Sequence, residues 1–600
     1  MQQKRLLLAL LISIGILFSW SYFFVKPTEQ QPVKDTTAAE SPSPTASVSP
    51  PDATPTPTPG STPVVNQTQE PRRTLTVKTP LYEAKFDSRG AQVVSWIIKK
   101  NKDSGRDIHS VASSKNSLVP LELVSPEGLK RGEVPLQITI GDNALDTNLS
   151  NTSYTIEGTE SATGDVELNL SGSEKKTITF LSQEGSGLTV SKKITLDAER
   201  YTVDLEMLIK RGDQIVPAKL RIGPSIGDQG IRTYTFYSVA PEGIAAFADK
   251  VERHTAPSIN ENKSTPDRLA VSGAVDWAGI GDTYFAMVAI PSNRAEGLEF
   301  RTVQYDHQAN GKPEKRYLIE ALVPIPTDGS RTVIYVGPKD HFILTEGSQE
   351  ISAAVGRQID LEGLIDYGWF TWLSRPIAIP ILKAIRWLHR ITNSYGLAII
   401  LFTIVIYSLF FPLKWRSSKA MKKAQKLAPR MKELQEKIKG MKQSDPKLKE
   451  LQMEQLRLMK EGNPLGGCLP LLIQMPFLFA LYRAITISLD FRQASFLWLP
   501  DLSAGDPLHI LEFLMAGTMI VLQLITPAPS ADPMQRKMMA IGMPLFMLYV
   551  LWGAPAGLLV YWLVGNIVGF SQQFLINYLT KSDGEIPTEK ASATPLRKGS

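Results

Sequence analysis

The chain of 600 residues is poor in the side chains that carry redox and metal chemistry, with one cysteine, Cys468, and six histidines. A single cysteine excludes an intrachain disulfide, a dithiol redox motif and a zinc site built from cysteines. The histidines form no HExxH pattern, and the chain has no GxxxxGK[ST] phosphate-binding motif. We therefore expect no cofactor, no bound metal and no ATP-driven reaction.

Charge is missing from one long stretch, because the 43 residues Met538–Thr580 contain no Asp, Glu, Lys or Arg. As one helix they would be about 65 Å long, roughly twice the hydrocarbon core of a bilayer. The helix breakers Gly553–Gly557 divide the stretch. A buried hairpin of a soluble protein would carry Lys and Glu on its outward faces. The stretch therefore predicts two membrane-spanning helices joined by a turn.

Other uncharged runs have the length of membrane spans, and they are Leu6–Val25, Ile391–Leu413, Asn463–Tyr482 and Phe513–Ala531. Together with the hairpin they predict six transmembrane helices. Lys4 and Arg5 place the N-terminus in the cytoplasm. We interpret 1–26 as an uncleaved signal anchor, with a removed signal peptide as the alternative, and 581–600 as a cytoplasmic tail.

An exported β-rich region is predicted between the first two spans. Residues 27–71 are rich in Pro, Ser and Thr and indicate a disordered tether. In the following stretch, 72–345, apolar side chains such as Val203 and Leu205 alternate with polar ones, which is typical of half-buried strands. We predict an all-β sandwich that acts as a scaffold, because no pair of carboxylates or nucleophile suggests catalysis. Sugar binding and enzymatic activity stay open as alternatives.

Two amphipathic regions flank the second span. Residues 350–390 mix aromatic and basic side chains, and Leu361–Leu373 is predicted to be an interfacial helix on the outer surface, or else an ordinary linker helix. Residues 414–461 hold fifteen Lys and Arg against six Asp and Glu. They predict a cytoplasmic hairpin of two helices, the first kinked at Pro429 and the second beginning at Asp445-Pro446. Its basic faces fit anionic lipid or ribosomal RNA, or are only solvated.

Three stretches carry a resemblance to a known family, and they are NPLGGCLPLLIQMPFLFALY at 463–482, FRQASFLWLPDLSAGDPLHIL at 491–511, and DPMQRKMM with AGLLVYWLVGNIVGFSQQFLINYL within 532–579. The chain resembles the YidC/Oxa1/Alb3 membrane protein insertases, of the bacterial type with a large periplasmic domain. The likeness covers 1–26 and 350–580 well and is thinner in the β-rich region, at 82–96 and 282–291.

The resemblance implies a non-enzymatic insertase and chaperone of the bacterial inner membrane. Five spans within 391–580 would enclose a polar groove, open to the cytoplasm and to lipid. Integral membrane proteins would be inserted there, alone or with the Sec translocon, without nucleotide hydrolysis. The β-rich region would be a periplasmic super-sandwich, and both termini would be cytoplasmic. The implied partners are nascent membrane proteins, the Sec translocon, the ribosome through the basic hairpin, and anionic lipids, but not DNA.

The family pattern also places candidate site residues. The groove would be lined by Thr403, Tyr407, Tyr561 and Trp562, and the substrate would leave along Met475 and Pro476. Tyr407 stands where the family usually has an arginine, and a phenol offers hydrogen bonds but no charge. Arg416 lies nine residues on, about 13 Å toward the cytoplasm, and would stand at the entrance. We therefore expect this groove to work through hydration and hydrogen bonding.

Two rival functions remain open at this point. Six spans with prolines and the polar residues Gln474, Gln523 and Asn566 fit a solute transporter, although the spans show no repeated halves and no acid or base for coupling. A membrane-anchored periplasmic carbohydrate-active protein would place the activity in the β-rich region.

Overall fold

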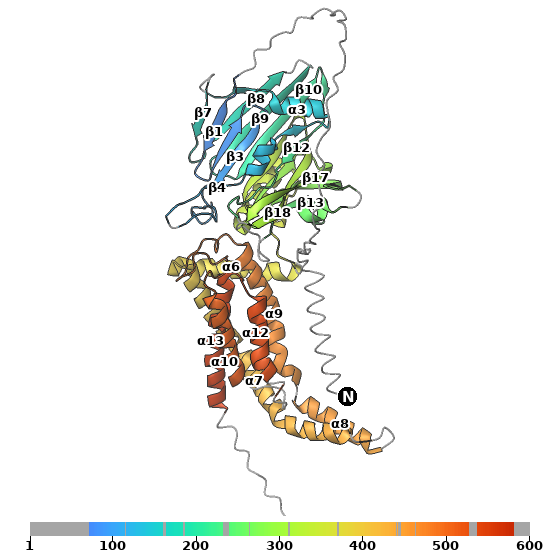
Figure 1. The fold of residues 1–600 in the computed structure, drawn as a ribbon, viewed down its shortest axis with the longest axis vertical. Helices are drawn as coiled ribbons and strands as arrows, with labels where there is room; N and C mark the ends of the chain where they lie inside the picture. The colour runs from blue at the N-terminus through green and yellow to red at the C-terminus, as the bar shows by residue number, and fades with distance from the viewer. Residues whose placement is uncertain are drawn as a thin grey trace, which may run out of the picture. The chain divides into compact units, whose positions relative to one another are not determined.

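The computed structural model describes residues 71–580 except for 115, 160–163, 184–186, 232–238, 263–264, 310–311, 369–370, 440, 442–445, 463, 527–533 and 535–536. The predicted signal anchor (1–26), nearly all of the tether (27–71) and the predicted cytoplasmic tail (581–600) lie outside the described residues. The described chain consists of a β-rich part followed by a helical part (Figure 1).

Two β-sheets make up the β-rich part. The smaller sheet contains β4 (Leu121–Glu122), β3 (Gln92–Ile98), β2 (Tyr82–Asp87), β1 (Thr74–Lys78) and β7 (Val166–Asn169), in that order. The larger sheet has fourteen strands, and its main path runs through β5 (Ile138–Thr139), β12 (Ala218–Ile222), β18 (Lys312–Ile325), β17 (Ala295–Ala309), β15 (Arg268–Gly281), β16 (Phe285–Pro291), β19 (Asp328–Pro338), β10 (Thr202–Arg211), β9 (Leu188–Asp197), β8 (Lys175–Gln183) and β6 (Thr155–Glu157). Beside this path lie β11 (Gln214–Ile215), β13 (Glu242–Phe247) and β14 (Val251–Thr255).

The alternating sequence pattern corresponds to buried and exposed faces of the strands. In β10, Val203, Leu205, Met207 and Ile209 are all buried, and the residues between them are partly exposed. The turn after β2 needs a left-handed backbone, and Gly90 supplies it with φ of 75°. The prediction of half-buried strands is therefore confirmed.

Aromatic rings and one lysine join the two sheets. The ring of Phe86 in β2 lies 6.2 Å from that of Phe180 in β8. Lys192 of β9 is fully buried, and its Nζ donates hydrogen bonds to the carbonyl oxygens of Ala91 (2.6 Å) and Leu136 (2.7 Å). An ammonium group buried between sheets is costly unless it is hydrogen-bonded, so the bond to Ala91, in the turn between β2 and β3, ties the smaller sheet to β9 of the larger one.

Short helices interrupt the β-rich part, and longer ones follow it. The short helices are α2 (Pro126–Arg131), α3 (Asn143–Asn151) and α4 (Ala256–Asn260). The later ones are α5 (His341–Val355), η1 (Leu361–Leu364), α6 (Thr371–Thr392), α7 (Tyr395–Lys439), α8 (Pro446–Gly462), α9 (Pro464–Ile487), α10 (Ile510–Ile525), η2 (Met538–Gly542), α12 (Met543–Val550) and α13 (Ala556–Leu579).

The interfacial helix predicted at Leu361–Leu373 is wrong in its limits. In the described residues of this range, the 3-10 turn η1 covers Leu361–Leu364, and α6 begins only at Thr371. Gly368 has φ of 86°, which a continuous helix does not allow, and its N–H is bonded to the Asp366 carboxylate. The amphipathic helix is therefore α6, and it continues past Ile391, the residue at which we predicted the next membrane span to begin.

A single helix, α7, joins the second predicted span to the basic hairpin. It is 45 residues long and passes through Pro412 and Pro429, where we expected a separate cytoplasmic helix. The second helix of the hairpin, α8, begins at Pro446 as predicted. Leu434 and Leu458 are buried, and α8 packs against α7, which agrees with a shared apolar seam.

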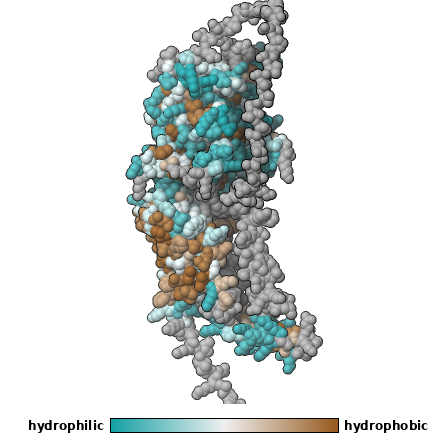
Figure 2. Space-filling model, viewed as in Figure 1, coloured by the Kyte–Doolittle hydropathy of each residue, from teal (hydrophilic) through white to brown (hydrophobic). Residues whose placement is uncertain are grey.

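The uncharged stretch near the C-terminus forms the predicted helix–turn–helix. The turn occupies Leu551–Pro555, where Gly553 has φ of 72°. Hydrophobic residues cover much of the visible helical surface, and hydrophilic ones cover much of the β-rich part (Figure 2). Among the described residues, α7 and α13 are long and apolar enough to cross a membrane, and Ile510–Ile525 and Met538–Val550 are shorter apolar helices. The number of six spans therefore stays a prediction.

Burial of Lys192 makes the stability of the β-rich part depend on pH. It lowers the pKa of Lys192 from 10.5 to about 7, so between these values the unfolded chain binds more protons than the native one. The free energy of unfolding should therefore rise as the pH rises through that window. Denaturant titrations of the full-length protein in detergent, followed by the β-sheet circular dichroism signal, test this. Lys192→Met should flatten the rise, whereas Lys175→Met, at an exposed position, should leave it unchanged.

Candidate functional site

Helices α7, α9 and α13 bring polar and aromatic side chains together around Tyr407. The Gln474 side-chain amide of α9 donates a hydrogen bond to the Tyr407 hydroxyl at 3.3 Å. The rings of Tyr407 and Tyr561 meet edge-on with centroids 6.1 Å apart. Phe477 of α9 lies next to both Tyr561 and Phe402, with ring centroids 6.4 Å and 6.2 Å away. One hydroxyl–amide pair is thus enclosed by aromatic rings from three helices.

Two glycines one turn apart on α13 allow α7 to approach closely. A Cβ atom added at Gly565 would lie 2.3 Å from the Tyr407 hydroxyl oxygen, and one added at Gly569 would lie 3.3 Å from Nζ of Lys414. Small residues at this spacing let the backbones of two helices come together. The pair Gly565 and Gly569 therefore provides the space that Tyr407 and Lys414 occupy.

Polar contacts continue along α7 and α13 and form what we call the polar seam. It is made of Tyr407, Lys414, Ser418 and Lys422 on α7, of Gly569, Gln572 and Gln573 on α13, and of Thr580, the residue that follows α13. Nζ of Lys414 donates to the Gly569 carbonyl at 2.8 Å, and Gln572 donates to the Tyr407 carbonyl at 2.9 Å. Gln573 donates to the Ser418 hydroxyl, and Lys422 to the Thr580 hydroxyl. The seam is thus a row of hydrogen bonds between α7 and α13, which begins in the apolar part of α7 and continues into its basic part.

The opposite side of α13 is bonded to α10 in the same way. Asn566 donates to the Thr518 hydroxyl at 3.0 Å, and Asn577 donates to the Ile525 carbonyl at 3.2 Å. Helix α13 therefore carries polar side chains toward both of its neighbours, and among the described residues the buried Oε1 of Gln572 has no hydrogen-bond partner. Such interhelical hydrogen bonds are worth about 0.6–2 kcal/mol each in an apolar environment.

The residues predicted to line the groove lie near this seam but differ in exposure. Thr403 is fully buried, and its hydroxyl donates to the Ile399 carbonyl of its own helix. Tyr561 is buried and faces Tyr407, while Trp562 is partly buried. Thr403 therefore offers its hydroxyl to the helix backbone, whereas Tyr407 bonds a neighbouring helix.

The remaining predicted residues lie toward the surface. Met475 is 39% exposed and Pro476 is partly buried, which leaves Met475 free to contact lipid or another chain. Arg416 is exposed, while Lys414, two positions earlier, points at α13. Two positions along a helix turn the side chain by about 200°, so Lys414 and Arg416 point to nearly opposite sides of α7.

The seam contains residues that sequence reasoning missed. Lys414, Gln572 and Gln573 were not among the candidates, and Gln474 was considered only for a transporter. The spacing of Gly565 and Gly569 was a usable signal, because small residues four apart mark a close helix contact. The partner of that contact depends on how the helices pack.

Comparisons with known proteins cover nearly the whole chain. Residues 387–583 match the family model described as 60Kd inner membrane protein, and residues 74–380 match the model described as YidC periplasmic domain. The membrane protein insertase YidC of Geotalea daltonii is 31% identical over 591 residues, which cover 96% of this chain and 99% of that protein. The chain belongs to the YidC family. The YidC of Maridesulfovibrio salexigens is 30% identical over 594 residues, with the same coverage of both chains.

The family assignment confirms the resemblance stated from the sequence, with a β-rich periplasmic domain followed by a helical region. A crystal structure described as an active YidC insertase with its first transmembrane domain resolved is 18% identical and covers 84% of this chain and 94% of its own. Its TM-score is 0.31.

The space above Gly565 gives a prediction on stability. Gly565→Ala places a methyl group against the rigid Tyr407 ring, so we expect a loss of about 1–3 kcal/mol from overpacking and a lower unfolding temperature in detergent. Combining it with Tyr407→Leu should recover part of the loss. Gly517→Ala on α10 is the matched control, because an added Cβ there meets nothing within 4 Å. An equal loss in both alanine variants would contradict the assigned contact.

Proposed function

We propose that this protein is a membrane protein insertase and chaperone that acts without catalysis. The observation that carries the proposal is the likeness to proteins named membrane protein insertase YidC across 96% of the chain at 31% and 30% identity. The polar seam supports it, because it places hydrogen-bonding side chains within the helical region, among them Gln572, whose buried Oε1 has no partner in the described residues.

The physical basis of the proposal is the cost of moving polar groups into hydrocarbon. A hydrophilic tail crossing a bilayer loses its hydration, which costs several kcal/mol for each unsatisfied group. Hydrogen-bonding side chains along the way divide that cost into smaller steps. Release of the substrate's apolar helix into lipid supplies the driving force, at roughly 0.8 kcal/mol per buried CH₂ group. No nucleotide is needed.

The proposed arrangement places the β-rich domain in the periplasm and both termini in the cytoplasm, with six spans in the bacterial inner membrane. The substrate would enter from the cytoplasm beside Lys414 and Lys422 and leave along Met475 and Pro476. Tyr407, Tyr561 and Trp562 would face the polar part of the substrate. Thr403 would support the helix backbone at this level.

The proposed partners are nascent membrane proteins, supplied directly or through the Sec translocon. The basic hairpin is the proposed contact for the ribosome and for anionic lipid. In support, exposed cations lie along it, and Arg430 pairs with Glu454 at 2.8 Å, which joins α7 to α8. Such a preformed basic surface suits a polyanionic partner.

Reconstitution tests the function directly. The full-length protein in liposomes without nucleotide should insert a small single-spanning test protein well above the level in empty liposomes, as measured by protease protection. A solute transporter or a periplasmic carbohydrate-active protein would give no gain over empty liposomes. That result would sink the proposed function.

Hydrogen bonding at Tyr407 should matter for insertion. Replacing Thr403 and Tyr407 together by Leu should lower the insertion rate by about tenfold, because a lost hydrogen bond of about 0.5–1.5 kcal/mol is joined by an unsatisfied Gln474 amide. The rate of protease protection in proteoliposomes measures this. An unchanged insertion rate would contradict the role assigned to Thr403 and Tyr407.

The cation that serves the seam should be Lys414 and not Arg416. Lys414→Met removes a charged hydrogen bond worth about 1.5–3 kcal/mol and should slow insertion roughly tenfold or more. Arg416→Gln removes an exposed charge only two residues away and should leave the rate within about twofold. Equal rates for the two variants would show that the position on the helix face has no importance.

A further inference from the structure

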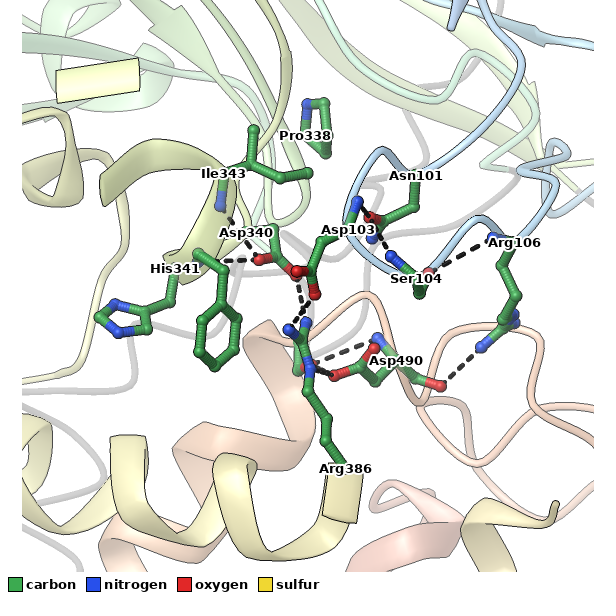
Figure 3. Close-up of polar contacts among 12 residues, drawn as sticks. Asn101, Asp103, Ser104, Arg106, Pro338, Asp340, His341, Ile343, Arg386 and Asp490 are labelled. Carbon is green, nitrogen blue, oxygen red and sulfur yellow. Dashed lines mark hydrogen bonds and ion pairs between the residues drawn. The ribbon is translucent and has the colours of Figure 1, made fainter. Parts of the chain in front are cut away.

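One arginine of α6 binds three carboxylates that come from separate parts of the chain (Figure 3). Arg386 pairs with Asp340 at 2.6 Å, with Asp490 at 2.5 Å and with Asp103. Asp103 lies between β3 and β4, Asp340 between β19 and α5, and Asp490 after α9. We call Arg386 with these three residues the arginine clamp. It joins the β-rich domain to the helical region.

Further bonds fix the clamp residues in place. Asp340 caps α5 by accepting from the N–H of Phe342. Asp490 accepts from the hydroxyl of Tyr395 at the start of α7, and its backbone carbonyl accepts from Arg106 of the β-rich domain at 2.7 Å. The clamp residues are thus tied to the β3–β4 connection and α5 on one side and to α6 and α7 on the other.

The clamp holds more negative than positive charge. Three carboxylates face one guanidinium, and the side chains of Asp340 and Asp490 are each only 2% exposed. Repulsion between carboxylates is strong where water is excluded. The other titratable side chains that face these carboxylates are Arg106, Tyr201, Tyr335, Tyr367, His389 and Tyr395. The Arg106 guanidinium donates its hydrogen bonds to the backbone carbonyls of Asp490 and Arg492 and not to a clamp carboxylate.

Nearby, a balanced ion pair also joins the two parts. Arg492, in the loop after α9, pairs with Asp228 of the β-rich domain, and both side chains are almost fully buried. One cation meets one anion in this pair, whereas three carboxylates meet one guanidinium in the clamp. The excess of carboxylates over guanidinium therefore distinguishes the clamp from this pair.

We propose that the arginine clamp is a proton-sensitive latch, which holds the β-rich domain to the helical region more tightly when the outer compartment is acidic. A proton on one carboxylate removes repulsion while Arg386 keeps its remaining pairs. Loss of that proton at higher pH loosens the contact. The inference is independent of the insertase activity.

The direction of the pH effect follows from burial. Desolvation raises the pKa of Asp340 above its usual 3.8, although Arg386 opposes the rise. When the clamp opens, Asp340 enters water and its pKa returns toward the usual value. At pH values between the ordinary pKa of Asp340 and its raised pKa in the closed state, the closed state binds more protons than the open state. Closure therefore weakens as the pH rises through that range.

The test measures the distance between the two parts in the full-length protein. Spin labels at Asp213→Cys and Leu497→Cys, both exposed, are placed on a Cys468→Ser background in nanodiscs. Electron paramagnetic resonance distances are compared between about pH 5 and pH 8. The distribution of distances between the two labels should be narrower at the lower pH, and the open fraction should rise toward the higher pH.

Variants separate the latch from general stability. Asp340→Asn keeps the helix cap, removes one negative charge, and should give the narrow distribution at both pH values. Arg386→Gln should broaden it at both. Arg331→Gln breaks a one-to-one pair with Asp204 inside the larger sheet and should leave the pH response intact. A parent distribution that is the same at both pH values overturns the proposal, as does a full pH response in Asp340→Asn. If Arg386→Gln does not fold, Asp340→Asn decides.

Discussion

The close approach of α7 and α13 at Gly565 and Gly569 is the contact on which the helical region depends. Without side chains at these two positions, α13 leaves room for the Tyr407 ring and exposes the Gly569 carbonyl to Lys414. Larger residues would separate the helices and leave both groups without these partners. In an apolar environment each unsatisfied polar group costs several kcal/mol. Two glycines therefore make a row of hydrogen bonds possible between α7 and α13.

Charge is handled differently where the helical region meets the β-rich domain. Lys414 sits among apolar helices, and its ammonium is satisfied by a backbone carbonyl. Arg386 collects three carboxylates from three loops. A planar guanidinium with five donors serves several acceptors at once, whereas an ammonium is a compact point charge. The bond of Lys414 holds a cation within the polar seam. The pairs of Arg386 join segments that are far apart in the sequence.

Local features of the fold were predictable from the sequence because they depend on neighbouring residues. The alternation in β10, the turn at Gly553 and the start of α8 at Pro446 all follow from short patterns. The limits of α6 were not predicted, because aromatic and apolar composition concealed the left-handed backbone at Gly368. The contact between Lys414 and Gly569, 155 residues apart, depends on how two helices pack. The sequence shows that Lys414 and Arg416 point in different directions from α7. Which of the two faces α13 depends on where α13 packs.

The seam is one-sided, and this bears on the choice between an insertase and a transporter. From Tyr407 to Lys422 its polar contacts extend over about 22 Å of α7. On the other side of Tyr407, the rings of Phe402, Phe477 and Tyr561 pack together. A transporter needs a path that opens alternately to both sides, and packed aromatic rings at one end oppose that. A polypeptide that enters from one side and leaves sideways into lipid needs only the polar half, and so the asymmetry favours insertion.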